Sequence, residues 1–485
     1  MTTAVNLAYL VASVLFILGM KRLSSPSTAR AGNRLSAVGM LVAVAATLLK
    51  GGILAPWAIV AGVALGGAIG ALLATRVQMT AMPEMVAALN GFGGGASALV
   101  AVAEVVRYLD AQDEGLAGAA FARHGLEPLG LVTVVTVLLS VLIGAVTFSG
   151  SFVAFGKLNG RISGKPLAFP GIRTLTVFLA VASLAAAAYP LAALGDSRFD
   201  AGPLWLAVCV LAALALALGV LLVLPIGGAD MPVVVSLLNS YSGLAAASTG
   251  FVLGNYALIV TGALVGASGI ILTRIMCEAM NRSLVHVLLG GFGGGGAGVA
   301  VAAGDAAGRT VRETTVEDAA VLLGYADRVV IVPGYGLAVA QAQHAVRELG
   351  DLLQARGAAV SYAIHPVAGR MPGHMNVLLA EANVPYDHLH EMEEINDQFE
   401  RTDVALVIGA NDVVNPAARS DPSSPIYGMP VLNVDQARNV IVMKRSMASG
   451  YAGVENELFH LPNNQMLFGD ARRSLERLVS EVKGL

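Results

Sequence analysis

The residues best suited to chemistry form a short glycine turn in the last third of the sequence. Residues 329–333 have strand character and run directly into Gly334, Tyr335 and Gly336, after which a helix-forming run continues to about residue 356. Such a unit can bind an anion, because glycine lets backbone N–H groups approach a phosphate and the helix dipole favours its charge. The spacing predicts a nucleotide site, with an ordinary tight strand–helix turn as the alternative.

The ends of other predicted strands carry polar residues that narrow the choice of nucleotide. No acidic residue follows the strand at 359–364, where a carboxylate would bind a ribose 2′-hydroxyl and repel a 2′-phosphate. Lys444, Arg445 and Ser446 follow a strand at 439–443 and suit a phosphate monoester, although a solvated charge pair is the alternative. The pattern therefore favours NADP over NAD. Neither a nucleophile–base pair nor a metal-ligand cluster is evident in the sequence.

Four polar residues within apolar runs form a second group of candidates. These are Asp230, Asn239, Asn90 and Ser268. Polar side chains within a membrane span are costly and usually functional, so we expect them to serve transport. For Asp230, which opens its run beside Pro232, a helix cap is the alternative.

Composition divides the chain into a membrane part and a globular part. Its 485 residues have a mean hydropathy of +0.70 and only 13% charged residues, against about 25% in a typical soluble domain. We expect a membrane domain at residues 1–280, a Gly/Ala-rich connector at 281–310 and a globular domain at 311–485. The net charge of −3 argues against nucleic acid as a partner, and the two cysteines suggest neither a disulfide framework nor a zinc site.

Apolar runs of the length that a bilayer requires occur about nine times in the membrane part. They lie at residues 4–20, 36–55, 57–75, 84–107, 128–149, 172–193, 202–224, 231–250 and 256–277. Basic residues follow the first and fifth runs, and acidic residues follow the fourth and sixth. Because basic loops stay in the cytoplasm, we expect the N-terminus outside and, with an odd number of spans, the C-terminal domain in the cytoplasm.

Strands and helices alternate in the globular part. Predicted strands lie at residues 329–333, 359–364, 386–390, 404–409, 430–434 and 439–443, and predicted helices at 336–356, 374–383, 393–401 and 470–483. This alternation predicts a Rossmann-like α/β domain with a parallel sheet, whose ligand lies at the carboxyl ends of the strands. The overall fold class is thus an α-helical polytopic membrane domain of about nine spans followed by a Rossmann-like parallel-sheet domain.

Several long motifs resemble the β subunit family of proton-translocating NAD(P) transhydrogenases. The matching segments are residues 226–235, 238–243, 334–343, 365–370, 372–379, 409–412 and 444–447. The likeness extends over essentially the whole chain. It implies that an α subunit binds NAD(H), that the C-terminal domain of this chain binds NADP(H), and that hydride passes directly between the two while a proton crosses the membrane into the cytoplasm.

The resemblance also implies roles for particular residues. The 334–339 turn would approach the pyrophosphate, the loops of Arg370 and Tyr451 would close over the nucleotide, and Asp412 would lie near the nicotinamide. Lys444, Arg445 and Ser446 would hold the 2′-phosphate. The full expected set is Gly334, Tyr335, Gly336, Ala338, Val339, Val367, Ala368, Gly369, Arg370, Gly409, Ala410, Asn411, Asp412, Lys444, Arg445, Ser446, Gly450, Tyr451, Ala452 and Gly453.

One position departs from many members of the family. They carry a histidine on the proton path where this chain has Asn90, and other members place that histidine in a membrane segment of a partner subunit. We therefore expect an α-subunit partner with an intramembrane histidine, and a dimer of α–β units in the bacterial inner membrane. In this chain Asn90, Asp230, Asn239 and Ser268 would line the path.

A nucleotide-gated ion channel or transporter is the alternative function. In it the Rossmann-like domain would act only as a sensor. The chain lacks a filter sequence flanked by membrane helices and charged residues that could line a pore, so the sequence favours the enzyme.

Overall fold

The chain forms two compact units that divide near residue 273, and each is described by itself. The computed structural model describes residues 2–49, 56–113, 130–164, 166–167, 169–193, 201–281, 283–284, 310–371, 373–424, 426–448 and 454–485. The expected connector, residues 281–310, lies largely outside these ranges, as do Gly450, Tyr451, Ala452 and Gly453.

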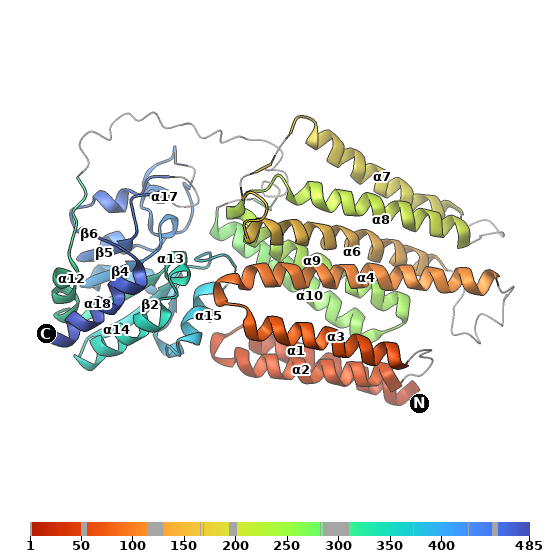
Figure 1. Cartoon of the computed structure of the whole chain (residues 1–485), viewed down its shortest axis with the longest axis horizontal. Helices are drawn as coiled ribbons and strands as arrows, with labels where there is room; N and C mark the ends of the chain where they lie inside the picture. Colours follow the sequence, from red (N-terminus) through yellow and green to blue (C-terminus); the bar gives the residue numbers. More distant parts are fainter. Residues whose placement is uncertain are drawn as a thin grey trace. The chain divides into compact units, whose positions relative to one another are not determined.

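Long apolar helices make up the first unit (Figure 1). They are α1 (Thr2–Leu23), α2 (Pro26–Leu49), α3 (Pro56–Arg76), α4 (Met82–Asp113), α6 (Leu131–Leu158), α7 (Ile172–Ala193), α8 (Ala201–Val223), α9 (Met231–Leu253) and α10 (Tyr256–Ala279). Among the described residues, eight of these helices are long and apolar enough to cross a membrane, which agrees approximately with the expected nine spans.

Helix α9 is the expected span that falls short in hydropathy, because it carries several polar residues. The neighbouring helices satisfy them: Ser240 Oγ donates to Gly266 O of α10 at 2.8 Å, and the hydroxyls of Thr249 and Ser140 of α6 lie 3.2 Å apart. Helices α9 and α10 touch backbone to backbone, since a Cβ on Gly243 would lie 2.4 Å from Gly266 N. Small residues permit this close packing in lipid, and about half of the residues of α9 are buried in the bundle.

The second unit contains a six-stranded parallel sheet with the strand order β3-β2-β1-β4-β5-β6. Its strands are β1 (Arg328–Pro333), β2 (Ala359–Ile364), β3 (Leu389–Glu391), β4 (Val404–Ile408), β5 (Asn439–Lys444) and β6 (Asn464–Phe468). The order reverses between β1 and β4, and doubly wound sheets bind ligands at the carboxyl edge of such a switch point.

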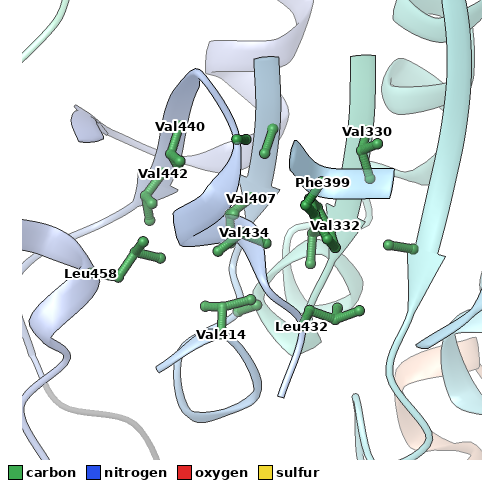
Figure 2. Packing of buried hydrophobic residues seen from close by; sticks show 14 of the residues in the cluster. Val330, Val332, Phe399, Val407, Val414, Leu432, Val434, Val440, Val442 and Leu458 are labelled. Atoms are coloured by element: carbon green, nitrogen blue, oxygen red, sulfur yellow. The ribbon is translucent and has the colours of Figure 1, made fainter. Parts of the chain in front are cut away.

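Alternate residues of the strands pack on opposite faces of this sheet, and both faces are buried. On one face they form a core with the short helix α16 (Met392–Ile395) and the segments around it (Figure 2). Labelled members of this core are Val330, Val332, Phe399, Val407, Val414, Leu432, Val434, Val440, Val442 and Leu458. Elsewhere in the unit α18 (Ala471–Gly484) contacts both α12 (Val316–Gly324) and α14 (Gln343–Ala355).

Several expected elements differ from the structure, and one strand was not expected. The helix expected at 393–401 is the short α16 followed by a 3₁₀ helix at Asn396–Arg401, and the strand expected at 386–390 begins as a 3₁₀ turn, Tyr386–His388. The helix expected at 336–356 is split into α13 (Tyr335–Val339) and α14, because Gln341 has a φ of +50°. The expected strand 430–434 is wrong: it is an irregular segment whose apolar residues fill the core, and Leu432 N donates to Val413 O. The sixth strand is β6, whose polar start gave little strand signal.

The second membrane helix also differs from its expected span at 36–55. It begins at Pro26, so Arg30 and Arg34 lie within α2 rather than in a loop. Residues 50–55 lie outside the described residues.

Candidate functional site

The loops that leave β1 and β4 interlock at the switch point through three glycines. Gly334 N donates to Ile408 O, and Gly336 N donates to Gly409 O, both at 2.9 Å. A Cβ on Gly334 would lie 2.4 Å from Ala410 N, and one on Gly409 would lie 2.4 Å from Gly336 Cα. The glycines are thus required for backbone contact between two loops, and two of the N–H groups suggested for a phosphate are donated to protein carbonyls instead.

Tyr335 joins the β1 loop to the loop after β2. The guanidinium carbon of Arg370 lies 4.6 Å from the centre of the Tyr335 ring, a cation–π contact. The ring of His374, at the start of α15 (His374–Glu381), lies 6.2 Å from the same ring, and its Nδ1 accepts a 3.1 Å hydrogen bond from Arg370 N. The structure therefore brings together the residues expected from the two loops. His374 orients the backbone of Arg370.

His365 fixes the start of the β2 loop from within the protein. It is 1% exposed, its Nδ1 accepts from Val367 N at 3.2 Å, and its Nε2 lies 2.8 Å from Pro430 O. Since Nδ1 accepts a hydrogen bond, it carries no hydrogen in the neutral ring, and Nε2 must carry the hydrogen that is donated to Pro430 O. Burial lowers the pKa of His365 to about 4, so the ring is neutral at physiological pH.

Lys444, at the carboxyl end of β5, lies beside the β4 loop. Its Nζ is 3.4 Å from Asn411 Oδ1, 2.8 Å from Ala448 O and 4.6 Å from the centre of the Phe459 ring. Burial lowers the pKa of this half-buried lysine, and the Asp412 carboxylate partly opposes the shift. Lys444 is thus a cation held at the sheet edge, and Arg445 and Ser446 follow it with exposed side chains.

Two buried asparagines support this arrangement. Asn456 is 2% exposed and donates from Nδ2 to Asn411 O at 2.9 Å, while its Oδ1 accepts from Leu458 N. Asn415 is fully buried and donates from Nδ2 to Glu455 O at 3.0 Å. Both connect the segment after β5 to the β4 loop. Sequence reasoning missed Asn456, because its partner lies 45 positions away.

Several of the expected site residues contribute backbone or packing rather than a reactive side chain. Ala338, Ala368 and Ala410 are buried within the domain, and Val367 packs beside a small apolar cluster. Val339 is exposed on α13, and Gly369 has a φ of +108° where the chain turns towards His374. This edge carries the cations Arg370, Lys444 and Arg445 and the hydroxyl of Ser446, which are groups of the kind that bind anions.

In the helical unit the candidate Asn90 hydrogen-bonds to two other helices. Asn90 is 8% exposed, its Nδ2 donates to Ser151 Oγ of α6 at 2.9 Å, and its backbone oxygen accepts from Ser242 of α9 at 3.1 Å. Among the described residues its Oδ1 has no hydrogen-bond partner. Ser151 was missed by sequence reasoning, because small hydroxyls are frequent in membrane helices.

The other three residues expected on the path are not gathered around Asn90 by the hydrogen bonds of the described residues. Asn239 is half-buried on α9, three residues before Ser242, and Ser268 donates to Val265 O of its own helix. Asp230 immediately precedes α9 and its side chain makes no capping bond to that helix, so the cap alternative is not supported. Ser242 lies twelve residues beyond Asp230, about 18 Å along the helix.

Proteins of a known family resemble this chain over nearly its whole length. A family model described as NAD(P) transhydrogenase beta subunit matches residues 5–481. The chain is 54% identical over 475 residues to a protein named NAD(P) transhydrogenase subunit beta from Rhodospirillum rubrum, covering 98% of each chain. A second protein of that name, from a strain of the same organism, has the same identity and coverage.

Proposed function

The chain belongs to the NAD(P) transhydrogenase beta subunit family, and we propose that its parallel-sheet domain binds NADP(H). Membership implies nicotinamide nucleotide binding, an alpha subunit as partner, and a multi-pass protein of the inner membrane. NAD(H) would bind to the alpha subunit. The observation that carries the proposal is the placement of Lys444 and Arg445 at the carboxyl end of β5, beside the β4 loop at the switch point.

The residues present fit a nucleotide with a 2′-phosphate. Arg445 and Ser446 are exposed and Lys444 is half-buried, so two cations and a hydroxyl are available to a phosphate monoester. The residue that follows β2 is His365, which is neutral and turned into the protein, rather than an acid that would repel that phosphate. Arg370, stacked on Tyr335, is a further cation for the diphosphate.

The proposed reaction is NADH + NADP⁺ + H⁺(out) → NAD⁺ + NADPH + H⁺(in). The bound nicotinamides supply the hydride chemistry, with specificity for opposite faces of the two rings. This chain binds and orients NADP(H) so that its nicotinamide is accessible to the alpha subunit. Asp412, at the β4 loop, would lie at the nicotinamide end.

The membrane helices would supply the proton pathway. Asp230, Asn239, Asn90 and Ser268 are its proposed residues, and the buried Asn90 with its partner Ser151 supports a polar passage between α4, α6 and α9. Since Asn90 does not titrate, we propose that a histidine in a membrane segment of the alpha subunit exchanges the proton. One charge that moves through 100 mV supplies about 2.3 kcal/mol, which can drive NADPH formation beyond equilibrium.

The proposed assembly is a dimer of alpha–beta units, with the N-terminus outside and the sheet domain in the cytoplasm. Coupling requires one element with two states that both the nucleotide and the proton bias. The chain between α10 and the sheet domain, together with α10 itself, is the proposed element.

Proteoliposomes that contain both subunits test the proposal. With the sheet domain facing the medium, NADPH should reduce an NAD analogue while protons move into the vesicle lumen. Hydride transfer without proton movement would refute the coupling. Proton flux that responds to NADP without the alpha subunit would refute the enzyme in favour of a nucleotide-gated transporter.

A further inference from the structure

A buried cation at the end of α6 has no part in the function proposed so far. Lys157 is the only charged residue of α6, and it is 5% exposed. An uncompensated buried ammonium group is strongly unfavourable, so its surroundings must provide hydrogen-bond acceptors. The acceptors identify what this lysine does.

Lys157 binds the carbonyl end of a different helix. Its Nζ donates to Ile226 O at 2.7 Å and to Leu224 O. Helix α8 ends at Val223, so these carbonyls lie just beyond its last turn. They lie near the negative end of the α8 dipole, which favours a lysine ammonium at this place.

Residues 224–230, which we call the elbow, connect α8 to α9 and end in Asp230. The segment that follows α6 packs against the elbow: Gly228 N donates to Gly164 O at 2.8 Å, and Leu167 N donates to Leu224 O at 3.3 Å. Within the elbow Asp230 N donates to Gly227 O at 3.1 Å. These bonds are between neutral backbone groups, and Lys157 adds a charged contact from α6 to the elbow.

Helix α6 therefore contacts two parts of the proposed proton pathway. Ser151 accepts from Asn90, and six residues later, about 9 Å along the axis, Lys157 binds the elbow. Any shift of the elbow relative to α6 would move Asp230 relative to Asn90. We propose that Lys157 is a positioning residue, whose ammonium holds the elbow so that Asp230 stays in register with the polar residues of α4, α6 and α9.

This inference rests on the proposed function, because it assigns Asp230 to the pathway. It differs from a purely structural role in what it predicts. A structural lysine would affect folding and all activities together. A positioning lysine affects the number of protons moved per hydride transferred, and another cation of similar reach can replace it.

The test compares Lys157→Met, Lys157→Arg and the control Lys21→Met, which removes an exposed cation near the end of α1. Each is assayed as the full complex with the alpha subunit in proteoliposomes. For Lys157→Met we expect at least about a tenfold fall in protons per hydride, because the variant loses both charge-assisted hydrogen bonds to the elbow. NADP affinity should be unchanged, and the amides of Gly228 and Asp230 should exchange hydrogen faster.

Lys157→Arg should recover most of the coupling, and Lys21→Met should behave as wild type.

Two results would overturn the inference while the wild-type complex remains coupled. One is wild-type coupling in Lys157→Met, and the other is equal uncoupling by Lys157→Arg and Lys157→Met. If Lys157→Met does not assemble, Lys157→Gln replaces it, since glutamine can donate but carries no charge, and wild-type coupling of that variant overturns the inference. Failure of the proposed function is distinct, because the wild-type complex itself would then transfer hydride without moving protons.

Discussion

Gly336 and Gly409 lie in loops from neighbouring strands, and their backbones touch. The N–H of Gly336 donates to the carbonyl oxygen of Gly409 at 2.9 Å, and Gly409 has a φ of +65°. A side chain on Gly409 would therefore meet both an unfavourable backbone conformation and the Cα of Gly336, 2.4 Å from its Cβ. This contact aligns the two strand ends at the switch point.

Gly409→Ala is expected to damage both the domain and its ligand site. Overpacking and the left-handed conformation together cost about 2–4 kcal/mol. Because the shifted loop carries Asn411, which contacts Lys444, NADP affinity should fall at least about tenfold, as for one lost charge-assisted bond. Calorimetric titration of the reconstituted subunit with NADP and urea unfolding of its sheet domain measure the two effects.

Gly357→Ala is the matched control, because Gly357 also has a positive φ, +98°, but a Cβ there would have nothing within 4 Å. Its free energy of unfolding should fall only by the cost of the left-handed conformation, about 1 kcal/mol, and its NADP affinity should be unchanged. Equal loss of affinity in the two variants would mean that the contact with Gly336 is not what shapes the site.

The sequence predicts the strands that flank this contact well, for a physical reason. Runs rich in valine and isoleucine, buried on both faces, mark β1 and β4, and each run is followed within two residues by a glycine. The apolar segment 430–434 is wrongly predicted as a strand for the same reason. Its side chains are apolar because they are buried in the core, although the backbone there forms no strand. Strand β6 carries polar residues at its first two positions and so escapes notice.

The charged residues of the proposed site can be read from the sequence, whereas the contacts that support them cannot. Lys444 and Arg445 are visible because cations at a strand end are uncommon, and the structure places Lys444 beside the β4 loop. Asn456 and Ser151 could not be predicted, because each acts through one hydrogen bond to a distant part of the chain. Such pairings depend on tertiary packing rather than on local pattern.

Lys444→Ala combined with Arg445→Ala should weaken the binding of NADP far more than the binding of NAD. The two cations are the proposed partners of the 2′-phosphate, which NAD lacks. NADP affinity should fall at least about tenfold for each lost charge-assisted bond, whereas the weak affinity for NAD should hardly change. Equilibrium titration of the full subunit with each nucleotide measures this.

The control for this pair is Arg472→Ala with Lys483→Ala, which changes the net charge equally on exposed residues of α18. NADP affinity should remain as in wild type at physiological salt. If the Lys444/Arg445 variant lost affinity for NADP and NAD equally, these two residues would not be the binding site of the 2′-phosphate.

His365 should make the sheet domain sensitive to acid. Its pKa is about 4 in the folded protein, against 6.5 for an ordinary histidine. Below pH 6.5 the unfolded state binds the proton more readily, so stability falls as the pH falls from 6.5 to 4, by about 3 kcal/mol in total. Above pH 6.5 this contribution is complete and constant.

His365→Asn tests this pH dependence. Asparagine cannot titrate but can still donate to Pro430 O, so the variant should be less stable at pH 7.5 and lose less stability on acidification. Urea unfolding of the sheet domain in the full subunit, followed by proteolysis at several pH values, measures the difference. The exposed His344→Asn serves as control, and a His365→Asn profile parallel to that of wild type would contradict the assignment.

Asp230→Asn should impair coupled turnover and spare nucleotide binding. The substitution preserves the size of the side chain. It replaces a carboxylate at the start of α9, which can bind and release a proton, by an amide, which cannot. Coupled turnover in proteoliposomes should fall at least about tenfold, while NADP affinity stays the same. A variant with wild-type proton flux would remove Asp230 from the pathway.

Asn90 and Ser151 should act as one unit in proton transfer, because the amide of Asn90 donates to the Ser151 hydroxyl at 2.9 Å inside the bundle. Asn90→Ala and Ser151→Ala should each slow coupled turnover by about tenfold, the effect of losing a buried hydrogen bond. The double variant should be no slower than either single one, since both remove the same contact. As control, Ser248→Ala, whose hydroxyl donates to Leu244 O of its own helix, should leave turnover unchanged with or without Asn90→Ala. A hundredfold loss in the Asn90/Ser151 double variant would show that the two residues contribute independently and that the hydrogen bond between them does not serve the pathway.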